Sequence, residues 1–258
     1  MPPHSLPSLL VVLVNFIIAG AQKCGTTAVF NALSLHPDIG VSVPKEVHFF
    51  DDDALFSHPP VDYDQYHRHF RPDDCSRLRG EATPAYLYWQ PCPARIKAYN
   101  PAIKLILILR NPVERAYSHW NMLTHKGRET LPFGEALRAE PARLRQADTG
   151  QSKPYSYMDR GFYACQLERY LSLFAREQIL VLPYEELVAD FGQVYRTLCD
   201  FLGLPAIDPP ACNTAYALPY TVPLGTTDRQ FLLEVFRDDI TRLERLLGWD
   251  CSHWLAVE

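Results

Sequence analysis

The stretch "AGAQKCGTTAVF", residues 19–30, ends an apolar run, passes through a turn and begins a segment of helical character. Gly20 and Gly25 have the spacing of a phosphate-binding loop, in which backbone N–H groups at the start of a helix cradle a phosphate. The usual loop places its lysine directly after the second glycine. Here Thr26 occupies that position, and Lys23 lies between the glycines. The stretch therefore predicts a phosphate site whose lysine approaches the ligand from a different direction.

The rest of the chain alternates short apolar runs with amphipathic segments, a pattern typical of a parallel sheet covered by helices. Strands are expected at 11–19, 39–43, 79–82, 104–109 and 179–182. Helices are expected at 26–35, 91–99, 112–126, 162–175, 185–203 and 228–247. The predicted fold is α/β with three layers: a mostly parallel central sheet flanked by helices, with a P-loop-like phosphate-binding loop after the first strand. We expect residues 1–258 to form a single domain that binds its ligand beyond the carboxyl ends of the strands.

Composition narrows the classes of function. The 258 residues carry a formal net charge of −5, so the molecule as a whole offers no cationic field for nucleic acid. Seven cysteines are scattered without a CxxC pair. This argues against a structural zinc site and favours mostly reduced thiols in a cytoplasmic protein, although one or two disulfides remain compatible. The apolar run ending at Ala19 follows no lysine or arginine and is short for a bilayer, so neither a signal peptide nor a transmembrane segment is expected.

The position of Lys23 separates sulfuryl donors from phosphoryl donors. In ATP-binding loops the lysine reaches the terminal phosphates, and the next hydroxyl holds Mg²⁺. Lys23 would instead meet the bound group near the bridging oxygen of its leaving group. The apolar run "LILILR" ends in Arg110, where a metal-binding aspartate would be expected. A sulfuryl group carries one fewer negative charge than a phosphoryl group and fits such a site. The alternative is a glycine turn before a threonine-capped helix that binds no ligand.

Polar residues also follow the other predicted strands. Arg110 offers a planar fork for a second phosphate, and Ser118 lies about two turns into the next helix. An arginine at a strand end is also often a structural salt-bridge partner. Glu46 and His48 are one residue apart, so in an extended segment their side chains face the same way. Either residue is able to act as general base for an acceptor hydroxyl or amine, although a charged surface loop would contain the same residues.

Two further features have competing interpretations. His67 and His69 have an alternate spacing that suits a metal ion, but no third ligand has a compelling spacing, so an ordinary surface is favoured. Arg160 lies where a helix is expected to begin over the ligand-binding edge. It either contacts phosphate or faces solvent.

The pairing of "KCGTT" with "LRNPVERAYS" resembles the sulfotransferases that use 3′-phosphoadenylyl sulfate (PAPS). The blocks "PKEVHFFDDD", "GEATPAYLY" and "RGFYACQLERYLSLFAREQILVLPYEEL" are similar to the heparan-sulfate sulfotransferase branch and its bacterial relatives. The resemblance covers residues 16–250. It implies an enzyme that moves a sulfuryl group from PAPS to a hydroxyl, or less readily an amine, by in-line transfer. The product nucleotide would be adenosine 3′,5′-bisphosphate (PAP), and no metal is expected.

The resemblance also implies roles for single residues. Lys23 would stabilise the leaving phosphate oxygen, Glu46 would be the catalytic base and His48 its active-site neighbour. Asp51 matches a further acidic residue on the acceptor side. The donor would be bound by Lys23, Cys24, Gly25, Thr26 and Thr27 at the 5′-phosphosulfate and by Arg110 and Ser118 at the 3′-phosphate.

The sequence departs from the animal glycan enzymes of that branch at two places. Those enzymes carry a lysine before the Thr-Pro of the "GEATPAYLY" block, where this chain has Ala82. They also carry a basic Lys-Gly-Arg stretch where this chain has "NTAYALPYTVPLG", in which Tyr216 or Tyr220 is a candidate to pack on the adenine. These differences and the net negative charge disfavour a polysulfated acceptor. The expected acceptor is a carbohydrate, lipid or polyketide-type hydroxyl, free or presented on a carrier.

Two rival functions remain open from the sequence. An ATP- and Mg-dependent small-molecule kinase with a degenerate P-loop would use a similar loop, but the position of Lys23 argues against it. A non-catalytic nucleotide-binding protein would keep the fold without the reaction. The presence of Lys23, Glu46, His48 and Arg110 together argues against such a loss of activity.

Overall fold

The computed structural model describes residues 13–71, 76–147, 149–205, 207–208, 219–220 and 222–256. A five-stranded sheet in the order β2-β3-β1-β4-β5 forms its centre, and every neighbouring pair of strands is parallel. The strands are β1 (Phe16–Gly20), β2 (Ile39–Val41), β3 (Leu78–Ala82), β4 (Lys104–Leu109) and β5 (Ile179–Pro183). The predicted α/β fold is confirmed, and each expected strand overlaps an observed one.

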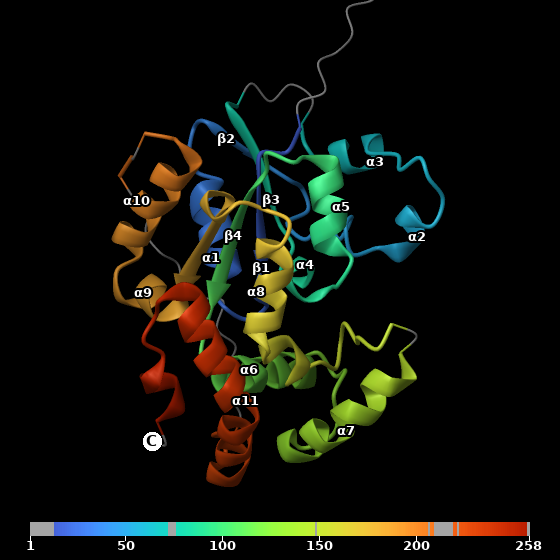
Figure 1. Cartoon of the computed structure of the whole chain (residues 1–258), viewed down its shortest axis with the longest axis vertical. Helices are drawn as coiled ribbons and strands as arrows, with labels where there is room; N and C mark the ends of the chain where they lie inside the picture. The colour runs from blue at the N-terminus through green and yellow to red at the C-terminus, as the bar shows by residue number, and fades with distance from the viewer. Residues whose placement is uncertain are drawn as a thin grey trace, which may run out of the picture.

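Helices cover both faces of the sheet and the edge where its strands end. They are α1 (Thr26–Leu33), α2 (Asp53–Phe56), α3 (Asp64–His67), α4 (Ala85–Tyr88), α5 (Cys92–Tyr99), α6 (Pro112–His125), α7 (Phe133–Gln146), α8 (Tyr163–Leu171), α9 (Tyr184–Ala189), α10 (Phe191–Leu202) and α11 (Thr226–Leu247). Short 3₁₀ turns lie at Asp159–Gly161, Arg176–Gln178 and Ser252–Leu255. Figure 1 shows α1 and α10 on one side of the sheet, α5 and α8 on the other, and α6 with α11 beyond the carboxyl ends of the strands.

The apolar character of the strands explains this layering. All five residues of β1 and five of the six residues of β4 are buried, so both faces of these strands need cover. The chain crosses from β1 to β2 in one direction and from β3 to β4 in the other. Because such crossovers are right-handed, their helices fall on opposite faces. The order places β1 between β3 and β4, so the segments that follow these three strands emerge side by side.

Two helix expectations need correction. The expected helix at 185–203 is wrong, because the structure has two helices, α9 and α10, separated at Asp190. The Asp190 carboxylate accepts a hydrogen bond of 2.9 Å from the Gln193 backbone N–H, so this residue caps a new helix instead of continuing the old one. The sequence interpretation also missed α7. Pro141 lies inside this helix, and a proline ordinarily argues against a helix interior.

The structure also describes most of the cysteines. Five cysteines are free thiols: Cys24, Cys92, Cys165, Cys199 and Cys251. Cys75 and Cys212 lie outside the described residues. Within the part of the chain that the structure describes, no helix has both the length and the apolar character needed to cross a bilayer.

Candidate active site

The first loop turns too tightly for any residue but glycine at two positions. A Cβ atom on Gly20 would lie 2.5 Å from the Cβ atom of Leu87, and one on Gly25 would lie 2.6 Å from a methyl group of Leu187. Gly25 also has a φ of 86°, and Lys23 has a φ of 73°. These left-handed conformations fold the loop back over the end of β1. The lysine therefore lies inside the turn, as its position in the sequence implied.

The loop leads directly into α1, and this junction offers free backbone donors. The helix ladder begins with the N–H groups of Ala28 and Val29, which donate to the Gly25 carbonyl at 3.0 and 3.3 Å. The N–H groups of Thr26 and Thr27 precede that ladder and point along the start of the helix, where an anion is favoured. Both predicted threonines are thus placed at a helix N-terminus next to Lys23.

Cys24 differs from its neighbours in the loop because its thiol points into the core. The side chain is fully buried, with Sγ 3.9 Å from the Tyr163 hydroxyl. That hydroxyl donates to the Arg110 carbonyl oxygen at 3.0 Å, which ties the loop to the end of β4. Burial raises the pKa of Cys24 to about 11, so the thiol stays protonated. Any contact of Cys24 with a donor would therefore come from its backbone.

Lys23 is influenced by other charged groups of the site. Burial is the main cause that lowers its pKa, and the positive charges of Lys126 and Arg110 lower it further. The negative charge of Glu46 acts in the opposite direction. Lys23 is thus within electrostatic range of Arg110 and Glu46, although these residues follow different strands. The positive charges of Lys126 and Arg110 near Lys23 favour the binding of a multiply charged anion.

Arg110 and Ser118 flank the same edge from β4 and α6. The Arg110 guanidinium lies over the Tyr184 ring, 4.9 Å from its centroid. Its Nη2 atom is 3.8 Å from a carboxylate oxygen of Glu114, too long for a hydrogen bond, whereas Arg229 contacts the other oxygen at 2.7 Å. The structural salt bridge weighed for Arg110 is therefore weak, because Arg229 is the closer partner of Glu114. Among the residues that the structure describes, no carboxylate lies within hydrogen-bond distance of the Arg110 guanidinium.

Tyr220 lies beside this arginine. Its ring stacks on Tyr117 with 5.2 Å between centroids. The ring is 46% exposed, so one face is open. Tyr216, the other tyrosine considered for the adenine, lies outside the described residues. Adenine stacking by either residue stays a prediction.

A second cluster, which we call the charge row, consists of Lys45, Glu46, His48, Asp51 and Lys153. The Glu46 carboxylate lies 3.0 Å from Lys45 Nζ and 3.6 Å from His48 Nε2. The other ring nitrogen of His48 lies 2.9 Å from Asp51 Oδ2, which in turn lies 3.1 Å from Lys153 Nζ. Positive and negative groups therefore alternate along the row. Asp51 is fully buried, so its carboxylate supports His48 from behind instead of reaching the surface.

The row fixes the protonation of both candidate bases. The hydrogen bond to Asp51 and the carboxylate of Glu46, 3.6 Å away, raise the pKa of His48 to about 9. The interaction with the His48 ring, 3.6 Å away, is the main cause that lowers the pKa of Glu46 to about 2. At neutral pH His48 is an imidazolium and Glu46 is a carboxylate. Of the two residues, only Glu46 is then able to accept a proton in the ligand-free protein.

The segment that carries Glu46 and His48 is not extended, contrary to the expectation from the sequence. His48 has a φ of 56°, a left-handed conformation, and no strand forms there. The reason is that the backbone N–H groups of residues 47–50 donate to side-chain hydroxyls instead of to a neighbouring strand. The side chains of Glu46 and His48 still meet, but by a turn and not by strand periodicity.

Lys153 is a site residue that the sequence did not reveal. It reaches Asp51 from 102 residues further along the chain. Arg160 holds its loop: Nε donates to Ser156 Oγ at 2.8 Å and Nη2 donates to the Lys153 carbonyl at 2.8 Å. Arg160 is 4% exposed and lies 4.5 Å above the Tyr88 ring, so the expectation that it faces solvent is wrong. No local motif marks Lys153, because its partner is supplied by the tertiary fold.

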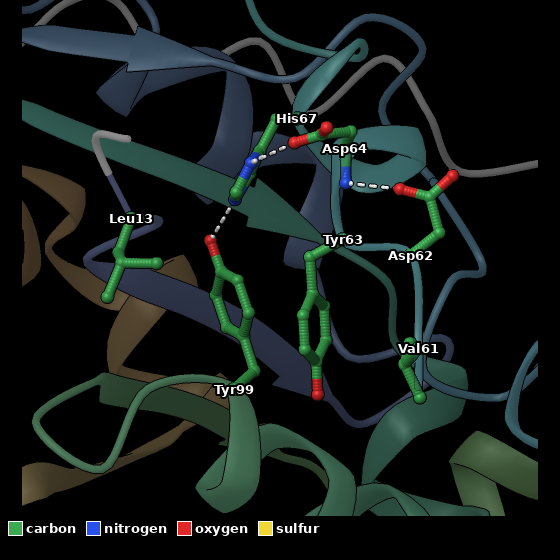
Figure 2. Close-up of a pocket in the computed structure, with 7 residues that line it drawn as sticks. All are labelled: Leu13, Val61, Asp62, Tyr63, Asp64, His67 and Tyr99. Atoms are coloured by element: carbon green, nitrogen blue, oxygen red, sulfur yellow. Dashed lines mark hydrogen bonds and ion pairs between the residues drawn. The ribbon is translucent and has the colours of Figure 1, made fainter. Parts of the chain in front are cut away.

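The histidine pair considered for metal binding lies elsewhere. His67 lines a cavity of about 350 Å³, with Nε2 2.8 Å from the Tyr99 hydroxyl and Nδ1 4.0 Å from Asp64. Figure 2 shows His67 between these two partners. Leu13 and Tyr99, which line it, precede β1 and β4, so the cavity lies at the opposite edge of the sheet from the first loop. Among the described residues, no three histidine, cysteine, aspartate or glutamate side chains are arranged to hold a metal ion.

Comparison with known proteins identifies the family. The sequence model of the sulfotransferase domain matches residues 14–211. This chain belongs to the sulfotransferase family. Heparan sulfate glucosamine 3-O-sulfotransferase 3A1 of Homo sapiens is 33% identical over 214 residues, which cover 80% of this chain and 49% of that protein. The chain therefore spans about half of the length of the curated relatives that it matches.

Solved structures agree with this assignment. The sulfotransferase from Alicyclobacillus acidocaldarius superimposes with a TM-score of 0.81 at 35% identity, covering 95% of this chain and all of that one (100%). Mouse sulfotransferase SULT7A1, crystallised as a complex with PAP, has a TM-score of 0.51 at 15% identity, covering 90% of this chain and 66% of that one. The second likeness concerns the fold alone. The roles assigned to single residues stay predictions.

Proposed function

We propose that this chain transfers a sulfuryl group from PAPS to an acceptor hydroxyl, with Glu46 as general base. The observation that carries the proposal is the placement of Lys23 beside the N-terminus of α1 in a sulfotransferase fold, with Glu46 in the segment that follows β2. One residue would serve the leaving group and the other the nucleophile. A cytoplasmic location remains a prediction from the cysteines and the N-terminal sequence.

The residues present fit the two anionic groups of the donor. The free N–H groups at the start of α1, together with Lys23, suit the 5′-phosphosulfate. Arg110, with its guanidinium fork only weakly paired, suits the 3′-phosphate, and Ser118 adds a hydroxyl in the same helix region. The lowered pKa of Lys23 supports this fit, because a bound anion would relieve the repulsion from Lys126 and Arg110.

The reaction follows from these positions. The acceptor oxygen forms a bond to sulfur while the bond between sulfur and the bridging phosphate oxygen breaks, and the electron pair stays with that oxygen. Lys23 stabilises the charge that develops there. The acceptor hydroxyl becomes strongly acidic as its new bond forms, so Glu46 is able to take its proton despite a pKa of about 2. His48, as an imidazolium between Glu46 and Asp51, holds the base in line.

The acceptor is proposed to be a hydroxyl of a carbohydrate, lipid or polyketide-type molecule. The names of the curated relatives point to a glycan. The animal glycan enzymes carry a lysine before the Thr-Pro of the "GEATPAYLY" block. This chain has Ala82 at that position, and Ala82 is fully buried. The lysines of the charge row are each paired with a carboxylate, Lys45 with Glu46 and Lys153 with Asp51. A row so balanced offers little surplus charge for a polysulfated chain, which favours a neutral acceptor.

Calorimetric titration with PAP, AMP and ATP–Mg²⁺ tests the donor assignment first. We expect PAP to bind more tightly than AMP by roughly 10-fold or more, since charge-assisted hydrogen bonds to the 3′-phosphate are each worth about 1.5–3 kcal/mol. Preference for ATP–Mg²⁺ would overturn the proposal in favour of the kinase alternative.

An acceptor panel tests the reaction itself. Radiolabelled PAPS would be incubated with a neutral glucosaminide, a long-chain alcohol, p-nitrophenol and an N-sulfated heparan oligosaccharide. Label transfer to one of the first three supports the proposed acceptor class, and preferential transfer to the heparan oligosaccharide contradicts it. Tight PAP binding without transfer to any acceptor would favour the non-catalytic alternative.

A further inference from the structure

Two buried hydroxyl groups hold the backbone of the segment that carries Glu46 and His48. Four consecutive N–H groups, those of residues 47 to 50, donate to side-chain oxygens. The Thr83 hydroxyl accepts the first two, at 3.1 and 3.4 Å, and the Tyr86 hydroxyl accepts the last two, at 3.0 and 3.4 Å. Thr83 and Tyr86 therefore replace the strand or helix that would ordinarily satisfy such a run of donors.

The proton of the Thr83 hydroxyl turns toward a buried carboxyl group. Glu81, near the end of β3, is fully buried. Its Oε2 atom accepts from Thr83 at 2.7 Å, and its Oε1 atom accepts from Tyr66 at 2.8 Å. Burial raises the pKa of Glu81 to about 7, while hydrogen bonds from Thr83 and Tyr66 act against that rise. The Thr83 hydroxyl is thus oriented by Glu81, and its lone pairs are left for the N–H groups of residues 47 and 48.

The held segment needs such support. His48 has a φ of 56°, which is unfavourable for a residue with a side chain and persists only where surrounding contacts fix it. Its ring must also meet Glu46 on one side and Asp51 on the other, at 3.6 and 2.9 Å. A segment free to relax would lose one or both of these contacts.

The sheet connects this support to the donor loop. β3 pairs with β1 in parallel register, with Ile17 opposite Glu81 and Ile18 opposite Ala82. β1 continues into the loop that carries Lys23, and β3 continues into Thr83. The paired strands β1 and β3 therefore position both Lys23 and the Thr83 hydroxyl, which holds the segment that carries Glu46.

We propose that Glu81, Thr83 and Tyr86 act as an anchor that positions Glu46 and His48 relative to Lys23. They are positioning residues and do not touch the substrate. The inference rests on the proposed function, since it assumes that Glu46 is the base. Its structural core, the fixing of His48 between two carboxylates, holds for the ligand-free protein and is testable without an acceptor.

A matched pair of variants at Thr83 tests the anchor. Thr83→Val removes the hydroxyl and keeps the shape, while Thr83→Ser keeps the hydroxyl. Tyr66→Phe is the control, because Tyr66 donates to the same Glu81 but holds no N–H group of residues 47–50. The readout is the pKa of His48, from NMR titration of its imidazole signals in the whole protein, assigned with a His48→Asn variant.

We expect the His48 pKa to stay near 9 in wild type, Thr83→Ser and Tyr66→Phe. In Thr83→Val it should fall by about one unit or more toward its ordinary value, because the ring no longer sits between Glu46 and Asp51. An unchanged pKa in folded Thr83→Val, or an equal fall in Tyr66→Phe, would overturn the anchor. Melting temperatures establish that each variant is folded. Should Thr83→Val fail to fold, Tyr86→Phe removes the other hydroxyl and carries the same expectation.

Transfer from radiolabelled PAPS to the best acceptor of the panel gives the second readout. We expect kcat to fall roughly 10-fold or more in Thr83→Val, with the KM for PAPS within about twofold and recovery in Thr83→Ser. A rise in the KM for PAPS without loss of kcat would also contradict the anchor. If no acceptor is found but the His48 pKa responds as expected, the proposed reaction fails while the anchor stands.

Discussion

The donor half and the acceptor half of the candidate site are built in different ways. The donor half comes from short contiguous motifs: a glycine loop with Lys23 and a strand that is followed directly by Arg110. The acceptor half brings Asp51 and Lys153 together across 102 residues and depends on an anchor after a third strand. The donor half gathers cations, whereas the charge row alternates signs. The donor half would suit an anionic nucleotide. The acceptor half would keep the proposed base, Glu46, ionised beside a less charged acceptor.

This difference predicts how the halves fail. A change in the donor half should remove charge stabilisation or affinity directly, because each cation acts on its own part of the ligand. A change in the acceptor half should act through neighbours, because each group of the row sets the state of the next. The predictions below separate these two behaviours.

The largest effect is expected for Lys23→Ala. The variant should lower kcat by roughly 10³-fold, because removing a donor that stabilises developing charge costs about 10²–10³-fold. The fold should be intact, since the loop depends on its glycines and not on the lysine side chain. Transfer from radiolabelled PAPS and far-UV circular dichroism check the two parts. Near-normal turnover would remove Lys23 from the mechanism.

A somewhat smaller loss is expected for Glu46→Gln. Loss of the general base should lower kcat by on the order of 10²-fold, with the affinity for PAP within about twofold of wild type. The same variant should lower the pKa of His48, because one of its two carboxylate partners becomes neutral. Calorimetry with PAP, together with the transfer assay, measures both effects. A large loss of PAP affinity would instead assign Glu46 to the donor half.

Arg110→Met should affect binding alone. The affinity for PAP should fall by roughly tens of fold, while the affinity for AMP, which lacks the 3′-phosphate, changes little. Arg110→Lys is the matched control, because it keeps the charge and loses the fork. Titrations of both variants with both nucleotides give the comparison. An equal loss of affinity for PAP and for AMP would mean that Arg110 contacts the 5′-phosphate.

The contrast also explains what the sequence was able to predict. Strand positions, the glycine loop and the placement of Arg110 depend on local apolar runs and turn residues, and these were confirmed. The break at Asp190 was missed because a capping aspartate in the middle of a helical pattern looks like an exposed helix residue. Lys153 and the left-handed His48 depend on partners distant in the chain. No periodicity within a short window contains that information.

The smallest predicted effect is a difference in how the two halves respond to alkaline pH. The folded-state pKa of His48 is raised to about 9, so its contribution to stability is complete below the ordinary value of 6.5 and is lost as pH rises through 9. The folded-state pKa of Lys23 is lowered, so the charged lysine destabilises the folded protein. This destabilisation decreases as pH rises and the lysine loses its proton. Wild type should therefore lose more stability than His48→Asn over the window from 6.5 to 9, and Lys23→Met should lose more than wild type toward the upper end.

Urea unfolding of the three proteins at several pH values measures this difference. The His48 effect should be on the order of 1 kcal/mol, since half-exposed ion pairs are screened by solvent. The other charges of the row, Lys45 and Lys153, are common to all three proteins and cancel in the comparison. Parallel stability curves for wild type and His48→Asn would mean that the imidazole is not held between Glu46 and Asp51 in solution. The acceptor half would then be assembled only when substrate binds, in contrast to a donor half that is formed in advance.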